Sequence, residues 1–188
     1  MKAPRPYDEL LAEILVSEEQ LQKRITELGA QISQDYQDKD LHLICILRGG
    51  VMFLTDLMRQ IDIPHTVDFM AVSSYGAGAR ESSGQVRIAL DLTNDIRGRD
   101  VLLVEDIVDS GNTIASVLEL LGARHPKSLR VCTLLDKKVM RQAEVPIHYT
   151  GFEIPNKFVF GYGLDLDEFY RDLPFIGVVD TTKYSPPD

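Results

Sequence analysis

The chain has 188 residues, which is enough for one domain with a substantial core, or for one core plus a small appendage. Hydrophobic residues make up 44% and charged residues 26%, as in an ordinary folded globular protein. The formal net charge of -9 repels phosphate backbones and anionic membranes, so we expect neither nucleic acid nor a membrane as a partner. An anionic substrate therefore needs backbone amides, cations or a bound metal at its site.

The two cysteines, Cys45 and Cys132, lie inside apolar runs. This placement indicates small core residues in strands and shows no disulfide framework. The sequence after Met1 lacks the apolar run of a signal peptide, and no stretch is long enough to span a membrane. These features fit a reducing cytoplasm, and we expect a cytoplasmic protein.

Helices and strands are predicted to alternate along the first three quarters of the chain. Ser17 begins a capping-box pattern with Gln20, and apolar residues at helical spacing extend that helix to about Tyr36. Two further helices are predicted from the apolar stripe at 51–61 and over 113–121, where Gly122 is a plausible stop. Apolar runs predict strands at 41–47, 65–72, 86–92, 101–104 and 129–135.

Two segments depart from this alternation. Residues 73–84 (SSYGAGARESSG) are rich in Gly and Ser and predict a mobile loop. From Pro146 onward, short strands and turns with many aromatic residues suggest a small extra subdomain. The remaining order of strands and helices predicts an α/β fold with a parallel sheet.

Residues 101–113 (VLLVEDIVDSGNT) carry the clearest chemical signal. Ligands of an open parallel sheet bind beyond the carboxyl ends of its strands, so we expect Glu105 and Asp106 to lie there. The turn at 109–113 offers successive backbone N–H groups, two hydroxyls and a glycine at the start of a helix, which together suit a phosphate. Acids beside an anion site suit a sugar phosphate.

Each half of this segment has another interpretation. An acidic pair after an apolar strand also occurs in phosphoacceptor receiver domains, but there the pair opens the domain, whereas here much of a domain precedes it. The 109–113 turn alone could be an ordinary helix cap. The two halves together, in a strand–loop–helix context, favour the sugar-phosphate site.

This segment resembles the phosphoribosyl-pyrophosphate binding motif of the type I phosphoribosyltransferases. From about Leu10 to Lys183, the chain resembles the hypoxanthine (hypoxanthine-guanine) phosphoribosyltransferase family. Further matching pieces are 47–50 (LRGG), 74–75 (SY), 134–138 (LLDKK), 158–165 (FVFGYGLD) and 171–172 (RD). The resemblance implies the type I fold, a mainly parallel central sheet flanked by helices, with a small hood subdomain. We expect one domain over 1–188, its hood built mainly from the N-terminal segment and about 146–188.

The resemblance also implies roles at the acidic segment. Glu105 and Asp106 would hold the ribose hydroxyls, directly or through Mg²⁺, because carboxylates accept hydrogen bonds and bind hard cations. Asp109 would be the catalytic acid/base at N7 of the purine, although it could instead be only the N-cap of the following helix. The 5′-phosphate would be cradled by Ser110, Gly111, Asn112 and Thr113.

The pyrophosphate would lie against a second set of residues. Arg48 and Gly49 resemble the pyrophosphate loop, where the family commonly has a cis peptide bond, expected here between Leu47 and Arg48. The family often has Lys in place of Arg48, and a plain Gly turn is the alternative interpretation of this segment. Arg171 would contact the pyrophosphate.

Asp165 would bind a second Mg²⁺. The neighbouring acids Asp167 and Glu168 leave open which carboxylate binds that ion. Ser74 and Tyr75 resemble the start of the flexible loop that closes over the reaction and excludes water.

The purine would be recognised by the remaining matches. Lys137 would donate to the 6-oxo oxygen and so disfavour adenine, with Lys138 as the solvated member of the pair. Phe158 would stack on the purine, although a core position is the alternative. Val159 would offer main-chain contacts to the base edge, and backbone and loop shape around Val159 and Asp165 would set selectivity at the 2-position.

The implied reaction is purine salvage: hypoxanthine, and also guanine, reacts with phosphoribosyl pyrophosphate to give IMP or GMP and pyrophosphate. The alternatives are a xanthine- or guanine-preferring relative, an RNA- or DNA-binding regulator with this fold, and a subunit without activity. The net charge of -9 and the joint presence of Asp109, Lys137 and Phe158 favour the enzyme. The family usually assembles as homodimers or homotetramers, and we expect one of these.

Overall fold

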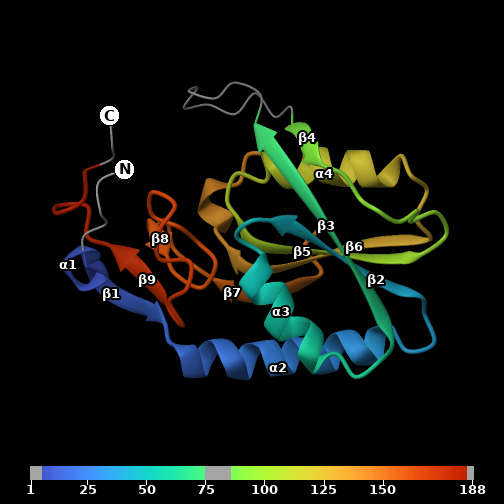
Figure 1. Ribbon diagram of the computed structural model, residues 1–188, viewed down its shortest axis with the longest axis horizontal. Coiled ribbons are helices and arrows are strands. Elements are labelled where there is room, and N and C mark those ends of the chain that lie inside the picture. The colour runs from blue at the N-terminus through green and yellow to red at the C-terminus, as the bar shows by residue number, and fades with distance from the viewer. Residues whose placement is uncertain (1–5, 75–85, 186–188) are drawn as a thin grey trace.

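The computed structural model describes residues 6–74 and 86–185 (Figure 1). Among these residues, no helix is both long enough and apolar enough to cross a membrane. The elements in chain order are α1 (Tyr7–Leu10), β1 (Leu11–Val16), α2 (Glu18–Asp35), β2 (Leu41–Leu47), α3 (Val51–Gln60), β3 (His65–Ser74), β4 (Val86–Leu90), β5 (Asp100–Val108), α4 (Asn112–Gly122), β6 (Ser128–Asp136), the short 3-10 helix η1 (Lys138–Met140), β7 (Tyr149–Glu153), β8 (Val159–Phe160) and β9 (Ile176–Val179).

The larger sheet has six strands in the order β4-β3-β2-β5-β6-β7. Every neighbouring pair is parallel except β3 and β4. Its central strands are almost continuous apolar runs because both faces of the sheet are covered, which is the usual state of a parallel sheet.

Alternate residues of β2 face two different cores. Leu43 and Cys45 pack with the buried residues of α2 and α3, whereas Ile44 and Ile46 pack with those of α4. Figure 1 shows the same division, with α2 and α3 on one side of the sheet and α4 on the other. Cys45 and Cys132 are buried free thiols in strands, as expected. The predicted α/β fold, a mainly parallel sheet flanked by helices, is confirmed.

A smaller antiparallel sheet, in the order β1-β9-β8, lies beside the larger one (Figure 1). Its inward side chains, among them Val16, Val159 and Ile176, belong to the same core as α2 and α3. The change of pattern expected from about residue 146 falls before β7, and β7 belongs to the larger sheet because it pairs in parallel with β6. The small sheet therefore takes its C-terminal strands only from β8 onward.

Two predicted boundaries differ from the observed ones in a way that matters for the site. The strand predicted over 101–104 extends to Val108, because β5 keeps its pairing with β6 as far as Val108 and Asp136. Glu105 and Asp106 are therefore inside the strand and not beyond its end. Of the loop predicted over 73–84, Ser73 and Ser74 still belong to β3, and the rest lies outside the described residues. By contrast, the capping box of Ser17 is confirmed.

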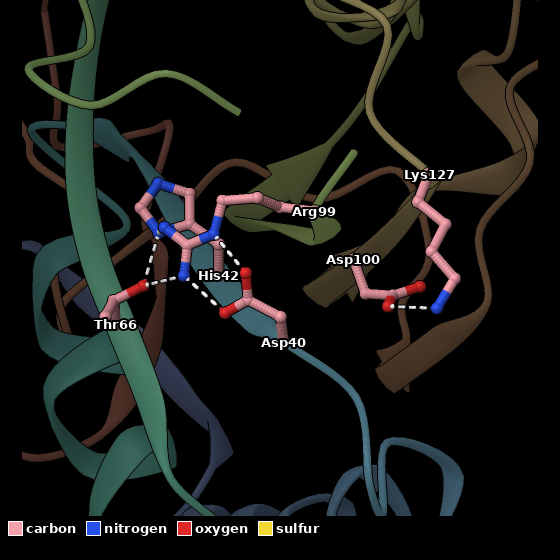
Figure 2. A network of polar contacts seen from close by, with 6 residues as sticks. All are labelled: Asp40, His42, Thr66, Arg99, Asp100 and Lys127. Carbon is pink, nitrogen blue, oxygen red and sulfur yellow. Dashed lines mark hydrogen bonds and ion pairs between the residues drawn. The ribbon is translucent and has the colours of Figure 1, made fainter. Parts of the chain in front are cut away.

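Polar side chains gather where the parallel strands begin (Figure 2). Arg99 donates to both carboxylate oxygens of Asp40, at 2.8 and 2.7 Å, and to the hydroxyl of Thr66 at 2.7 Å. Its Nη1 lies 3.2 Å from Nδ1 of the buried His42. Beside them, the buried Asp100 accepts from the hydroxyl of Ser128 at 2.6 Å. This network ties together the starts of several strands at the edge opposite to the site described next.

Candidate active site

The strand order reverses between β2 and β5. The chain goes from β2 through α3 to one side of the sheet, and from β5 through α4 to the other. Ligands of open α/β sheets bind at such a switch point, beyond the carboxyl ends of the strands. The segments that follow β2 and β5 are those that the sequence selected, Arg48–Gly49 and the turn at 109–113.

The two adjacent acids of β5 are buried at this edge. Glu105 and Asp106 are each only 9% exposed, and Oε2 of Glu105 is buried without a hydrogen-bond partner among the described residues. Burial, followed by the charge of Asp106, raises the pKa of Glu105 well above its usual value, and burial also raises the pKa of Asp106. Two buried acids side by side favour a cation or hydroxyl donors as partners.

Gly49 brings the loop after β2 directly against this pair. A Cβ atom on Gly49 would lie 1.6 Å from Oδ2 of Asp106, so no larger residue fits while that carboxylate keeps its place. The peptide bond between Leu47 and Arg48 is cis, as expected. The loop therefore lies against the acids instead of simply leading from strand to helix.

Asp109 and Lys137 lie together after the ends of β5 and β6. Their Oδ2 and Nζ atoms are 3.6 Å apart, with the lysine side chain 9% exposed and the aspartate 50% exposed. The backbone N–H of Lys137 also donates to the carbonyl of Val108 at 3.0 Å. Lys138 points instead to Glu153 at the surface, which leaves Lys137 as the cation of the site.

The turn at 109–113 begins α4 as predicted. Gly111 is its N-cap residue with a φ of 84°, a left-handed conformation that favours glycine, and the helix starts at Asn112. Asp109 is therefore not the N-cap, and its carboxylate is available for other chemistry. The first N–H groups of a helix lack intrahelical partners and favour an anion, so Ser110 to Thr113 remain the predicted phosphate cradle.

The loop that follows Lys137 binds this turn from the other side, through residues that the sequence analysis did not select. In the loop at 137–143, the N–H groups of Gln142 and Ala143 donate to the carbonyl of Ser110 at 2.8 and 3.0 Å. The side-chain amide of Asn112 donates to Oε1 of Gln142 at 3.1 Å. No local pattern announces these contacts, because they join segments about thirty residues apart.

The segment after β8 covers the loop after β2. A Cβ atom on Gly163, whose φ is 97°, would lie 2.1 Å from the carbonyl oxygen of Gly49. Arg171 donates to the carbonyl of Gly163 at 2.8 Å and pairs with Asp165 at 2.9 Å. Arg171 and Asp165 are therefore side by side, and both lie close to the Gly49 loop.

Arg48 makes an ion pair across this junction. Its guanidinium binds Glu168, which also lies 3.8 Å from Arg171. Glu168 is one of the alternatives to Asp165 as a metal ligand. The structure places it between Arg48 and Arg171, the two cations expected to contact pyrophosphate. The backbone N–H of Glu168 donates to Oδ2 of Asp165 at 2.9 Å.

Phe158 is 46% exposed, so the interpretation of it as a core residue is wrong. Its ring makes an edge contact with Tyr184, at a centroid distance of 5.7 Å. Val159 is buried in β8, which is an edge strand of the small sheet in the described part of the chain. The main chain of an edge strand has one side free to bind something other than a strand.

The predicted loop residues are only partly described. Ser74 ends β3, and Tyr75 lies outside the described residues. No three His, Cys, Asp or Glu side chains come together as a metal site in the described ranges. The acidic pair can hold a hard cation only if that cation completes its shell with oxygens from water or a substrate, which is how Mg²⁺ is usually bound beside phosphates.

Comparison with known proteins agrees with this geometry. The family model of the phosphoribosyl transferase domain matches residues 12–167. The hypoxanthine-guanine phosphoribosyltransferase of Mycobacterium avium is 55% identical over 177 residues, covering 91% of this chain and 87% of that protein. The hypoxanthine phosphoribosyltransferase of Escherichia coli K12 is 50% identical over 169 residues, covering 89% and 94%.

A solved structure is similarly close. The crystal structure of a hypoxanthine phosphoribosyltransferase from Staphylococcus aureus superposes with a TM-score of 0.92 at 46% identity, covering 95% of this chain and 97% of that one. Sequence and fold agree over nearly the whole chain, so the chain belongs to the phosphoribosyltransferase family with the type I fold, and within it to the hypoxanthine phosphoribosyltransferases, which are pentosyltransferase enzymes.

Proposed function

We propose that this enzyme transfers the 5-phosphoribosyl group of phosphoribosyl pyrophosphate to N9 of hypoxanthine, and also of guanine. The products are IMP or GMP and pyrophosphate, as in purine salvage. The observation that carries the proposal is the pair Asp109–Lys137, separated by 3.6 Å beside the anion-binding turn. A 6-oxopurine has an oxygen and a ring N–H that match a cation and a carboxylate placed together.

We assign recognition of the 6-oxo oxygen to Lys137. An ammonium donates hydrogen bonds and cannot accept them, so the 6-amino group of adenine is a poor partner. Asp109 would exchange the proton at N7 while the bond forms at N9. Because its side chain is 50% exposed, it can reach a bound base.

The anionic substrate would bind across three segments. The turn from Ser110 to Thr113 would hold the 5′-phosphate, and Arg48, Gly49 and Arg171 would contact the pyrophosphate. Glu105 and Asp106 would hold the ribose hydroxyls and Mg²⁺, with Asp165 as a further magnesium ligand. When bound, Mg²⁺ supplies positive charge that stabilises the leaving pyrophosphate. The orphaned Oε2 of Glu105 supports this assignment.

The small sheet and the residues after it would form a hood over the site, within one domain. Phe158 would stack on the purine, and the main chain at Val159 would bind the base edge. Ser74 and Tyr75 would begin the loop that closes over the substrates. The protein would act as a homodimer or homotetramer in the cytoplasm, where its two buried thiols stay reduced.

The proposal is tested by measuring nucleotide formation by absorbance with Mg²⁺ and phosphoribosyl pyrophosphate, offering hypoxanthine, guanine, xanthine and adenine in parallel. We expect turnover with hypoxanthine and guanine, and a decrease of about 10²- to 10⁴-fold in kcat for Asp109→Asn, which keeps the shape but loses the acid/base group.

Glu119→Gln, which neutralises an exposed acid on α4, is the matched control and should leave kcat unchanged. Absence of product with every 6-oxopurine would refute the proposed reaction. Equal kcat for Asp109→Asn and the wild type would refute the role of Asp109 alone.

A further inference from the structure

The loop at 137–143 links two parts of the site. At its start, the N–H of Lys137 donates to the carbonyl of Val108, and at its end the N–H groups of Gln142 and Ala143 donate to the carbonyl of Ser110. Both acceptors belong to the segment from β5 to the 109–113 turn. The loop therefore rests with both ends on the segment that contains the expected acid/base group and phosphate cradle.

A buried ion pair joins Arg141 of this loop to Asp136, the residue just before the loop. Arg141 binds the carboxylate of Asp136, the last residue of β6, through Nη2. The side chain of Asp136 is 3% exposed and that of Arg141 is 18% exposed, so water screens the pair little. The other terminal nitrogen of Arg141, Nη1, is buried and has no hydrogen-bond partner in the described ranges. Asp136 is therefore the acceptor that holds this guanidinium.

The Arg141 side chain also lies beside the turn. A Cβ atom on Gly111 would lie 3.1 Å from Cδ and 3.2 Å from Nη1 of Arg141, and 2.6 Å from the carbonyl of Ala143. The left-handed Gly111 is thus packed against the loop with no room for a side chain. Any movement of Arg141 changes the surface on which the 109–113 turn lies.

Packing does not hold the loop from outside. An open pocket of about 620 Å³ borders the loop, with Asp136, Lys138, Arg141 and Glu144 on one part of its lining and Val145, Pro146, Ile147 and Thr150 on the other. In the 3-10 helix of the loop, Val139 is 71% exposed and Met140 is 39% exposed. Because these two apolar side chains of the loop are exposed, we infer that its position depends mainly on its polar contacts.

We propose that the Asp136–Arg141 ion pair is a positioning element. It holds the 137–143 loop against the 109–113 turn, so that Lys137 and the phosphate cradle keep a fixed distance from each other. This buried contact, added to the main-chain hydrogen bonds at the two ends of the loop, thereby aligns the purine and the 5′-phosphate, which belong to the two different substrates. This inference rests on the proposed function, since it assigns the two ligands to those two segments.

The test compares Arg141→Met, Asp136→Asn and the double variant. Arg141→Met leaves the carboxylate of Asp136 buried without its partner, so we expect a lower Tm and a decrease of kcat/KM of about 10- to 100-fold for both substrates. The double variant removes both charges, and its Tm should return toward that of the wild type. Its kcat/KM should stay low, because the contact that positions the loop is still missing.

Amide hydrogen exchange of the substrate-free enzyme gives a second measurement. Exchange should become faster in peptides covering 109–113 and 137–143 of Arg141→Met, and peptides of the strand starts should not change. Lys138→Met is the matched control, because it removes a cation of the same loop whose partner, Glu153, is exposed. It should change kcat/KM by less than about twofold.

Recovery of kcat/KM together with Tm in the double variant would overturn the proposal, because the pair would then serve stability alone. Unchanged exchange of the 109–113 peptide in Arg141→Met would overturn it as well. If the wild type itself formed no nucleotide, the proposed reaction would fail, and the exchange measurement would still decide whether the pair holds the two segments together.

Discussion

The charged side chains at the two edges of the parallel sheet differ in their hydrogen-bond partners. Where the strands begin, Arg99 binds Asp40 with two hydrogen bonds and reaches Thr66 and His42 (Figure 2). Where the strands end, Glu105 has a buried oxygen without a partner among the described residues. Both edges contain ion pairs, and each has a buried atom without a hydrogen-bond partner among the described residues, Nε2 of His42 at the start and Oε2 of Glu105 at the end. The starting edge uses its charges to join strands, whereas the orphaned atom at the ending edge belongs to an acid that a ligand can bind.

The pKa values of the acids also shift in different directions at the two edges. Hydrogen bonds from Arg99 hold the pKa of Asp40 below its usual value, whereas burial raises the pKa of Glu105 and of Asp106. Asp68 is buried, yet its pKa is lowered. Burial raises its pKa, but hydrogen bonds from the residues around it, Phe69, Thr93 and Asn94, outweigh burial and lower it. Burial disfavours the charged form and hydrogen bonds to it favour that form, so the hydrogen bonds prevail at Asp68 and burial prevails at Asp106 despite the N–H of Ile107.

The largest effect on stability is expected at the starting edge. Arg99→Met would remove hydrogen bonds to Asp40, Thr66 and His42. Because the Asp40 carboxylate is 64% exposed, water screens the two bonds to it, and we expect the free energy of unfolding to fall by about 1–3 kcal/mol from the three partners together. Urea denaturation measures this change, and kcat/KM of the folded enzyme should remain that of the wild type.

Arg124→Met is the matched control, since Arg124 binds the carboxylate of Asp91 and its side chain is 30% exposed, against 18% for Arg99. Its loss should cost no more than about 1 kcal/mol. If the two variants lost equal stability, the network at the strand starts would be no more than a set of surface ion pairs, and the contrast between the edges would lose its basis.

At the edge where the strands end, we expect a substitution to increase the free energy of unfolding. Glu105→Gln would replace a buried acid by a neutral side chain of the same shape, so the folded protein without ligand should gain about 1 kcal/mol of stability. The same variant should lose activity, because it removes a group assigned to the ribose and Mg²⁺. Stability is measured by urea denaturation with a chelator, and again with Mg²⁺ and phosphoribosyl pyrophosphate.

With both ligands present, the wild type should be the more stable protein, because ligands that bind only the folded state stabilise it. Glu153→Gln changes an exposed acid and should stay within about 0.5 kcal/mol of the wild type. A loss of stability for Glu105→Gln without ligands would mean that the carboxyl group of Glu105 stabilises the fold. The inference that this edge keeps Glu105 for a ligand would then be wrong.

The sequence was sufficient for features that are local. The capping box at Ser17 and the apolar stripes determine helices within one segment. The acidic pair and the phosphate-type turn lie within thirteen consecutive residues, 101–113, so their order along the chain already places them together. The end of β5 was harder to predict, because Glu105 and Asp106 are polar yet remain paired in the sheet.

Contacts between segments that are far apart in the sequence could not be predicted from local patterns. The approach of Gly163 to Gly49, and of Glu168 to Arg48, depends on how the segment after β8 lies over the loop after β2. The bond from Gln142 to Ser110 depends on the course of a loop with no regular pattern. A weak signal existed only at the strand starts, where polar residues precede several predicted strands.

The pH dependence of stability gives the smallest effect and compares the two edges directly. Burial, followed by the charge of Arg99, lowers the pKa of His42, while Asp68 and Asp40 oppose this. The folded state therefore binds fewer protons than the unfolded state below the usual histidine pKa of about 6.5. This contribution to stability is present above that pH and is lost as the pH falls. Glu105 and Asp106 act in the opposite direction, because their raised pKa values make the folded state bind more protons.

We therefore expect the two contributions to cancel in part in the wild type between about pH 7.5 and 5.5. Glu105→Gln should make stability fall more steeply on acidification, and His42→Gln should make it fall less steeply or rise, each by about 1 kcal/mol or less over that range. Urea denaturation at several pH values, with a chelator present, measures both slopes. If His42→Gln left the slope unchanged, His42 would have the same proton affinity folded and unfolded. The contacts at the starting edge, those of Arg99 and Asp100 among them, would then contribute to stability independently of pH in this range.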